Sequence, residues 1–132
     1  MAELQVNILS PAKVVAKTKA SQVQLPGALG YLGILPGHTR FITELQAGAM
    51  TVEGAGGKQV YFVSGGYADQ AEDVLTVLVD VVEKPVDIDV ARAERAKQRA
   101  LERLGRKEGI DFARAQAALA RAEQRLMVAG KK

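Results

Sequence analysis

The sequence changes its pattern near Pro85, and this change constrains the fold more than any other feature. Before it, short runs rich in Val, Ile and Leu alternate with turns that contain glycine or proline. After Asp87 there is no proline, and alanine, arginine and glutamate predominate. Strands are typical of the first pattern and helices of the second. We therefore expect a fold that is mainly β plus α, with domains at residues 1–84 and 85–132.

The first domain has the pattern of many short strands. Apolar and polar residues alternate over residues 3–8, the period of a strand with one buried face. Val74–Val79 is almost continuously apolar, so we expect this strand to be covered on both faces. The glycine-rich stretch Gly54–Gly57 should close a hairpin between Ala49–Glu53 and Lys58–Ser64. Short strands at such spacing favour a β-sandwich or barrel over alternating β and α units.

The second domain has the pattern of an antiparallel two-helix hairpin. Asp87 or Asp89 is placed to cap the first helix, and Gly105 is placed to end it. Asp111 is placed to cap the second helix, after the short connection 108–110. The expected inner faces are Val90, Ala93, Ala96 or Lys97, Ala100 or Leu101 and Leu104 in the first helix, and Phe112, Ala115, Leu119, Ala122 and Leu126 in the second.

These inner faces are mostly alanine, which lets two helices approach closely but buries little apolar surface. Each buried CH₂ contributes roughly 0.8 kcal/mol, so the seam competes poorly with the entropy of ordering the hairpin. We expect helices that form readily but dock weakly. Such a hairpin can exchange between two positions.

The charge is divided between the two halves. Residues 1–87 hold 6 Lys and Arg against 9 Asp and Glu, a balance of −3. Residues 88–132 hold 12 against 6, a balance of +6. The basic tail should seek an acidic protein surface, nucleotide phosphates or nucleic acid.

Several function classes are excluded or disfavoured by composition. The absence of cysteine excludes disulfides, thiolate zinc sites and cysteine nucleophiles. No apolar run approaches the roughly 20 residues that span a bilayer, and the first residues do not resemble a signal peptide. We expect a cytosolic protein, or one that is peripheral on the cytosolic side of a membrane complex.

The sequence shows little sign of catalysis or of a metal site. His38 is the only histidine, and no serine lies in a Gly-x-Ser-x-Gly motif. The cluster Asp69, Glu72 and Asp73 could ligate a metal, but a turn before the Val74 strand is the preferred interpretation. The stretch 56–59 lacks the Ser or Thr of a phosphate-binding loop and is interpreted as a hairpin turn. Three further glycines are also interpreted as turns: Gly27, Gly30 and Gly33.

Longer segments resemble a known family. Gly33–His38, Phe62–Tyr67 and Asp73–Val79 are similar to the β domain of the epsilon subunit of bacterial F-type ATP synthase. Ile88–Ala93 resembles that family's Ile/Leu-Asp-x-x-Arg-Ala segment, and Ile110–Leu126 resembles its second helix. The resemblance covers essentially the whole chain.

This resemblance implies a flattened N-terminal β-sandwich in the central stalk, in contact with the gamma subunit and the c-ring. It also implies that the C-terminal hairpin either folds on the sandwich or extends along gamma, where its basic residues oppose ATP hydrolysis by facing acidic segments of the alpha and beta subunits. The subunit would be non-catalytic. It would lie peripherally on the cytoplasmic face of the bacterial cell membrane, attached only through the complex.

The resemblance also implies site residues. Tyr31 and His38 match the edge that faces the c-ring, although relatives often carry an acidic or polar residue at position 31. No cofactor is required, but regulatory ATP, with or without magnesium, would bind the folded hairpin because arginines from two helices can converge on phosphates. The residues implied for ATP are Glu83, Asp89, Arg92, Ala93, Arg99, Arg121 and Arg125.

Two alternatives stay open at this point. The chain could be a free-standing ATP-sensing module, or its basic hairpin could bind nucleic acid through phosphate contacts. Nucleic acid is disfavoured, because Phe112 is the one aromatic residue of the basic tail and lies on the expected inner face.

Overall fold

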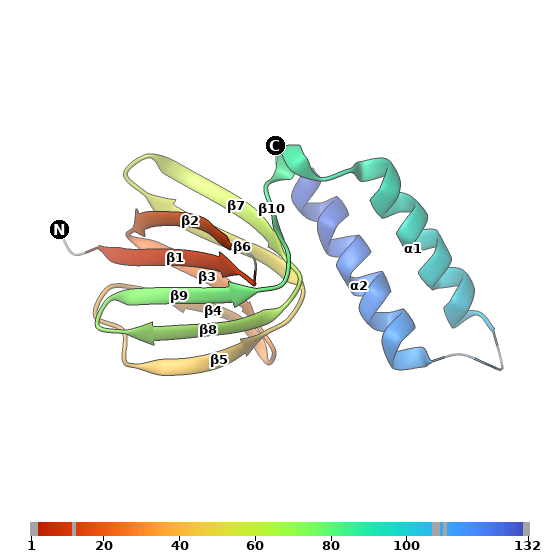
Figure 1. The fold of residues 1–132 in the computed structure, drawn as a ribbon, viewed down its shortest axis with the longest axis horizontal. Helices are drawn as coiled ribbons and strands as arrows, with labels where there is room; N and C mark the ends of the chain where they lie inside the picture. The colour runs from red at the N-terminus through yellow and green to blue at the C-terminus, as the bar shows by residue number, and fades with distance from the viewer. Residues whose placement is uncertain (1–2, 12, 107–108, 110, 131–132) are drawn as a thin grey trace.

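The computed structural model describes residues 3–11, 13–106, 109 and 111–130. Within these residues, strands precede the helices in chain order (Figure 1). The strands are β1 (Leu4–Ser10), β2 (Lys13–Ala20), β3 (Gln22–Gly27), β4 (Gly30–Ile34), β5 (Phe41–Leu45), β6 (Gly48–Gly54), β7 (Gly57–Val63), β8 (Gly66–Ala71), β9 (Val74–Val79) and β10 (Val82–Glu83). The helices are η1 (Pro85–Asp87), α1 (Val90–Leu104) and α2 (Phe112–Ala129).

The strands form the two layers of a sandwich. Hydrogen-bonded neighbours follow the order β10-β7-β6-β3-β5-β8-β9-β1-β2, and β4 pairs with β3. The strands β5, β8, β9, β1 and β2 make one layer, and β10, β7, β6, β3 and β4 make the other. The layers join where Gly27 of β3 pairs with Leu45 of β5. Most pairs are antiparallel, while β1 and β9 are parallel.

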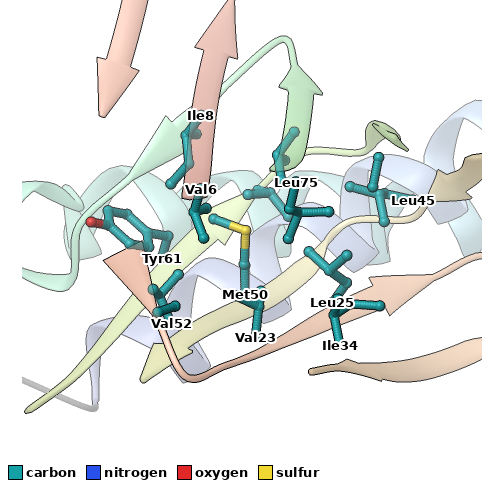
Figure 2. Close-up of a cluster of buried hydrophobic side chains, with 14 of the residues drawn as sticks. Val6, Ile8, Val23, Leu25, Ile34, Leu45, Met50, Val52, Tyr61 and Leu75 are labelled. Carbon is teal, nitrogen blue, oxygen red and sulfur yellow. The ribbon is translucent and has the colours of Figure 1, made fainter. Parts of the chain in front are cut away.

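The core lies between the layers, as the alternating pattern predicted. Leu4, Val6 and Ile8 of β1 are fully buried. They pack with residues of the opposite layer such as Met50 and Val52, which Figure 2 shows as one cluster of apolar side chains. The burial of apolar surface between the layers is the main contribution to stability.

The hairpin predicted at Gly54–Gly57 is confirmed, since β6 and β7 pair up to Gly54 and Gly57. Two other predictions are wrong. Gly33 is not in a turn but inside β4. Val74–Val79 is not covered on both faces, because the side chains of Val74 and Leu78 are 39% and 48% exposed. The sandwich has two layers, so a strand in it has one outer face.

The caps of the two long helices follow the sequence. Asp89, rather than Asp87, caps α1, and its carboxylate accepts a hydrogen bond of 3.1 Å from the Arg92 N–H. Asp87 instead lies in η1. Asp111 caps α2 through the Arg114 N–H, also at 3.1 Å. Gly105 follows the end of α1 as predicted, and residues 108 and 110 of the predicted connection lie outside the described residues.

The inner faces are confirmed at their centres and wrong at their margins. The buried residues of the seam are Ala93, Ala100, Ala115 and Ala122, and Ala96, Lys97, Leu104, Leu119 and Leu126 are half-buried. Val90, Leu101 and Phe112 are exposed. The alanine seam is narrow, so apolar side chains at its edges stay in contact with water.

The helices attach to the sandwich unequally. In Figure 1, α2 lies between the sandwich and α1. The last turn of α2 packs on β6 and β7, where Val128 and Ala129 join Ala49, Phe62 and Ile88 in a second apolar cluster. Val128 and Ala129 fall outside the predicted inner face. The hairpin is therefore held mainly through one end of α2.

Candidate functional site

The base of the hairpin brings Glu83 and Arg125 into contact. Glu83 ends β10, and Arg125 lies one turn before the docked end of α2. The Arg125 Nε donates a hydrogen bond of 2.7 Å to Glu83 Oε1, and each side chain is 28% exposed. The Arg125 guanidinium carbon also lies 4.6 Å from the centre of the Phe62 ring. A charge-assisted bond and a cation–π contact thus tie α2 to the sandwich.

The Ile88–Ala93 segment lies at the same end of the hairpin. The Asp89 carboxylate caps α1 and accepts from the Arg92 N–H. The Arg92 side chain is exposed, whereas Ala93 is 4% exposed and faces the seam. Asp89 therefore has a structural role whether or not a ligand binds, and Arg92 is accessible to an anion.

The two remaining predicted arginines differ in position. Arg121 is half-buried and lies in the middle of α2, eight residues before its docked end, whereas Arg92 lies in the first turn of α1. Arg99 is exposed and lies seven residues further along α1, about 10 Å toward the tip. The structure thus brings Glu83 and Arg125 into direct contact and places Arg92 at the same end of the hairpin, while Arg121 lies in the middle of α2 and Arg99 lies further toward the tip.

The two residues predicted to face the c-ring are not brought together. Tyr31, near the start of β4, is 57% exposed, and its hydroxyl oxygen accepts from the Ala49 N–H at 3.3 Å. His38 lies beyond the other end of β4, where its ring makes an edge contact with Phe41 at 4.9 Å. They belong to opposite ends of the strand.

An exposed apolar row, which the sequence did not predict, lies on the layer of β5, β8, β9, β1 and β2, called the outer layer below. Strand pairing aligns Tyr67 with Leu78, Leu78 with Leu9, and Leu9 with Val14, across β8, β9, β1 and β2. Tyr67, Leu78 and Val14 are 56%, 48% and 52% exposed. The signal was present in the excess of apolar residues in Val74–Val79, which we interpreted as full burial.

A second exposed apolar area surrounds the β3–β4 turn. Leu29 at the turn is fully exposed, and Ile42 on β5 is 73% exposed. Together with Tyr31 they line an open hollow of about 520 Å³. Exposed apolar patches of this kind mark contact surfaces for other molecules.

Two residues of the acidic cluster, Glu72 and Asp73, form the predicted turn, whereas Asp69 lies within β8. Glu72 and Asp73 connect β8 to β9 with left-handed φ angles of 51° and 60°. The Asp73 carboxylate accepts a hydrogen bond of 2.7 Å from the Gly37 N–H. Among the described residues, no group of three His, Cys, Asp or Glu side chains is arranged to hold a metal ion. No helix in the described part of the chain is long and apolar enough to cross a bilayer.

Comparisons with known proteins agree with this architecture. Residues 3–85 match the β-sandwich domain of the ATP synthase delta/epsilon chain, and residues 87–130 match its long α-helix domain. The ATP synthase epsilon chain of Moorella thermoacetica is 43% identical over 132 residues, covering 98% of each chain. That of Halalkalibacterium halodurans is 39% identical, covering 99% of this chain and all of the relative.

Solved structures share the fold. A chain in the Euglena gracilis mitochondrial ATP synthase structure, with OSCP, F1 and c-ring, has a TM-score of 0.86 at 20% identity and covers all of this chain and 83% of its own length. A chain of the Tetrahymena thermophila mitochondrial ATP synthase structure of the central stalk and c-ring has a TM-score of 0.60 at 16% identity. The match covers 97% of this chain and 94% of that chain. From the family match and the identity over nearly the full length, this chain belongs to the epsilon chains of ATP synthase.

Proposed function

We propose that this epsilon chain is a non-catalytic rotor subunit that docks in the central stalk through its sandwich and restrains ATP hydrolysis through its hairpin. Its partners are the gamma subunit, the c-ring and the alpha and beta subunits. It associates with the cytoplasmic face of the bacterial membrane through the complex alone. The attachment of the hairpin through one end of α2 is the observation that carries the restraining role.

The sandwich has the surfaces that docking requires. The row of Tyr67, Leu78, Leu9 and Val14 crosses four strands of the outer layer, while the hairpin packs on β6 and β7 of the other layer. The area around Leu29, Tyr31 and Ile42 offers a second apolar surface. We assign the row to gamma and the second area to the c-ring, because a subunit between two partners needs two separate surfaces.

The hairpin has the energetics of a reversible element. Alanines line the seam between α1 and α2, so separating them exposes little apolar surface. Docking of α2 rests on the cluster around Val128 and on the Glu83–Arg125 pair. A few kcal/mol of new contacts with acidic partner surfaces would shift such an equilibrium.

Regulatory ATP would act by holding the folded hairpin. Arg92 in the first turn of α1 and Arg121 in the middle of α2 belong to different helices, so phosphates bound by both would bridge α1 and α2. Because Glu83 already holds Arg125, ATP would bind beside this pair or replace the carboxylate as its partner. A ligand that binds only the folded form stabilises that form.

Reconstitution tests the restraining role. Adding the full chain to a catalytic complex depleted of epsilon should lower ATP hydrolysis, and a chain lacking residues 88–132 should bind the complex without this effect. Equal hydrolysis with both chains would refute the restraining role and leave the docking role intact.

Calorimetry tests the ATP site. The full chain should bind ATP with saturable heat, and Arg92→Ala and Arg121→Ala should each remove it. Arg95→Ala, another exposed arginine on α1, is the matched control and should bind as the unmodified chain does. Absence of heat at millimolar ATP would show that this hairpin is not an ATP sensor.

A further inference from the structure

A cleft at the open edge of the sandwich lies away from the hairpin seam and has no part in the function proposed above. It is bounded by β2, an edge strand of one layer, and by the β6–β7 hairpin of the other. Its volume is about 310 Å³. The polar residues that line it are Lys17, Thr18, Lys19, Gln59, Tyr61 and Lys84.

The lining is cationic on both sides. Lys17 and Lys19 project from β2, and Lys84 follows β10 on the opposite side. No carboxylate lines the cleft. Among the described residues, none of the three lysines lies within ion-pair distance of an acidic group. Like charges on three lysines around one cleft repel one another, and an anion bound among their side chains would relieve this repulsion.

The rest of the lining contains neutral hydrogen-bond donors, and one end of the cleft is open to solvent. Tyr61 is 5% exposed, and its hydroxyl points away from the other labelled core side chains in Figure 2. Burial raises the pKa of Tyr61, so its hydroxyl stays protonated and can donate. At the far end, added Cβ atoms at Gly56 and Gly57 would meet open space, so the hairpin leaves the cleft mouth uncovered.

The close approach of the two walls depends on Gly54. A Cβ at this position would lie 2.8 Å from the Lys19 carbonyl oxygen. The glycine therefore lets the β6–β7 hairpin come against the end of β2 and brings the walls of the cleft together.

A simpler role explains only part of this arrangement. Lysines on an edge strand discourage pairing with strands of other molecules, which would account for Lys17 and Lys19. It does not account for Lys84, which lies outside any strand, or for the lack of acidic groups in the lining. The adjoining hollow, which shares Tyr61 and Lys84, differs because Asp80, Glu83 and Asp87 also line it.

We propose that the cleft between β2 and the β6–β7 hairpin binds the phosphate group of a small anion through Lys17, Lys19 and Lys84. Its size suits a compact phosphate-bearing molecule or a lipid headgroup, and the chemistry of recognition is the same for both. The Tyr61 and Thr18 hydroxyls and the Gln59 amide supply the neutral donors.

A titration of the isotopically labelled full chain tests this site by nuclear magnetic resonance. Inorganic pyrophosphate should move the amide signals of Lys19, Gly56 and Gly57 and reach saturation. Lys84→Gln should weaken the affinity about tenfold. The double variant Lys17→Gln/Lys19→Gln, on the opposite wall of the cleft, should weaken the affinity by a similar factor. Lys58→Gln, on the same hairpin but outside the lining, should change the affinity by less than about twofold.

A parallel arm uses vesicles of phosphatidylcholine with phosphatidylglycerol. If the chain binds vesicles but not pyrophosphate, and Lys84→Gln weakens the vesicle binding, the phosphate is that of a lipid headgroup. Saturable binding of pyrophosphate would instead identify a free molecule. No saturable response to either probe, or equal losses in Lys84→Gln and Lys58→Gln, would overturn the proposal. The Arg92→Ala/Arg121→Ala chain should keep the cleft signals, which separates this result from the ATP site.

Discussion

The Gly37 N–H donates a hydrogen bond of 2.7 Å to Asp73 Oδ1, which joins the loop after β4 to the β8–β9 turn. Gly37 has a φ of +84° and follows Pro36, so the loop that carries His38 begins with a tight turn. The carboxylate satisfies a loop N–H from 36 residues away in the sequence. This contact holds the His38 loop against the outer layer of the sandwich.

Replacing Asp73 should loosen that loop. Asp73→Ala removes the acceptor and should cost about 1–2 kcal/mol of unfolding free energy, measured by urea denaturation. Amide hydrogen exchange at Gly37 and His38 should accelerate. Asp73→Asn keeps an acceptor oxygen and tolerates the left-handed φ, so it should lose less unfolding free energy than Asp73→Ala. Unchanged amide exchange at Gly37 and His38 in Asp73→Ala would show that the Gly37 turn is stable without this hydrogen bond.

Replacing Glu72 should stabilise the protein. Glu72 has a φ of 51°, where a side chain with a Cβ is strained. Glu72→Gly should gain roughly 0.5–1 kcal/mol, the relief of strain less the added freedom of the unfolded chain. Glu53→Gly, in an exposed position of β6, serves as the control and should destabilise. A loss of stability in both variants would contradict the strain argument.

Removing the buried amide of Gln70 should also stabilise the sandwich. Gln70 is fully buried, and neither its amide nitrogen nor its oxygen has a hydrogen-bond partner within the described residues. Gln70→Met fills a similar volume without a polar group and should gain about 1–2 kcal/mol in chemical denaturation. A loss would indicate that internal water satisfies the amide and that the substitution displaces it.

Breaking the Glu83–Arg125 pair should free the hairpin. Arg125→Ala should weaken docking by about 1 kcal/mol, since the pair is only partly exposed. Exchange of the Val128 amide should then quicken about fivefold. In the reconstituted complex the same variant should inhibit ATP hydrolysis more strongly, because fewer contacts oppose extension. Arg95→Ala, exposed on α1, should change neither quantity.

The protein should lose stability in alkali through Tyr61. Its ordinary pKa is 10.0, and burial raises it in the folded state. Above pH 10 the unfolded chain therefore releases this proton first, so the free energy of unfolding falls as pH rises from 10. Tyr61→Phe should flatten the decline when unfolding is measured from pH 8 to 11. If the free energy of unfolding falls equally with pH in the unmodified chain and in Tyr61→Phe, Tyr61 is not the group responsible for the decline.

Local patterns predicted much of the fold. The alternation in residues 3–8 identified the buried face of β1, the Gly54–Gly57 turn placed a hairpin, and Asp111 marked the start of α2. These features depend on neighbours in the chain, because strand period, turn conformation and helix caps are set within a few residues. The resemblance also indicated Glu83 and Arg125 as members of one site, and their side chains are in contact although 42 positions separate them in the sequence.

Other features could not be read from local patterns. The run Val74–Val79 was predicted to be buried on both faces, yet Leu78 is exposed in a row with Tyr67. Phe112 has the correct spacing for the inner face of α2 but is 50% exposed. Periodicity shows which residues share a face, but it does not show whether another element covers that face.

By itself, therefore, the sequence determined that a strand-rich first part would be followed by two capped, basic, alanine-lined helices. The tertiary structure decided that Val128 and Ala129 dock α2, that Asp73 holds the Gly37 turn, and that Lys84 faces the lysines of β2 across a cleft. The physical reason is that propensities and caps act between near neighbours. Docking surfaces and charged clefts arise only when distant segments pack, where burial and electrostatics between non-neighbours determine the outcome.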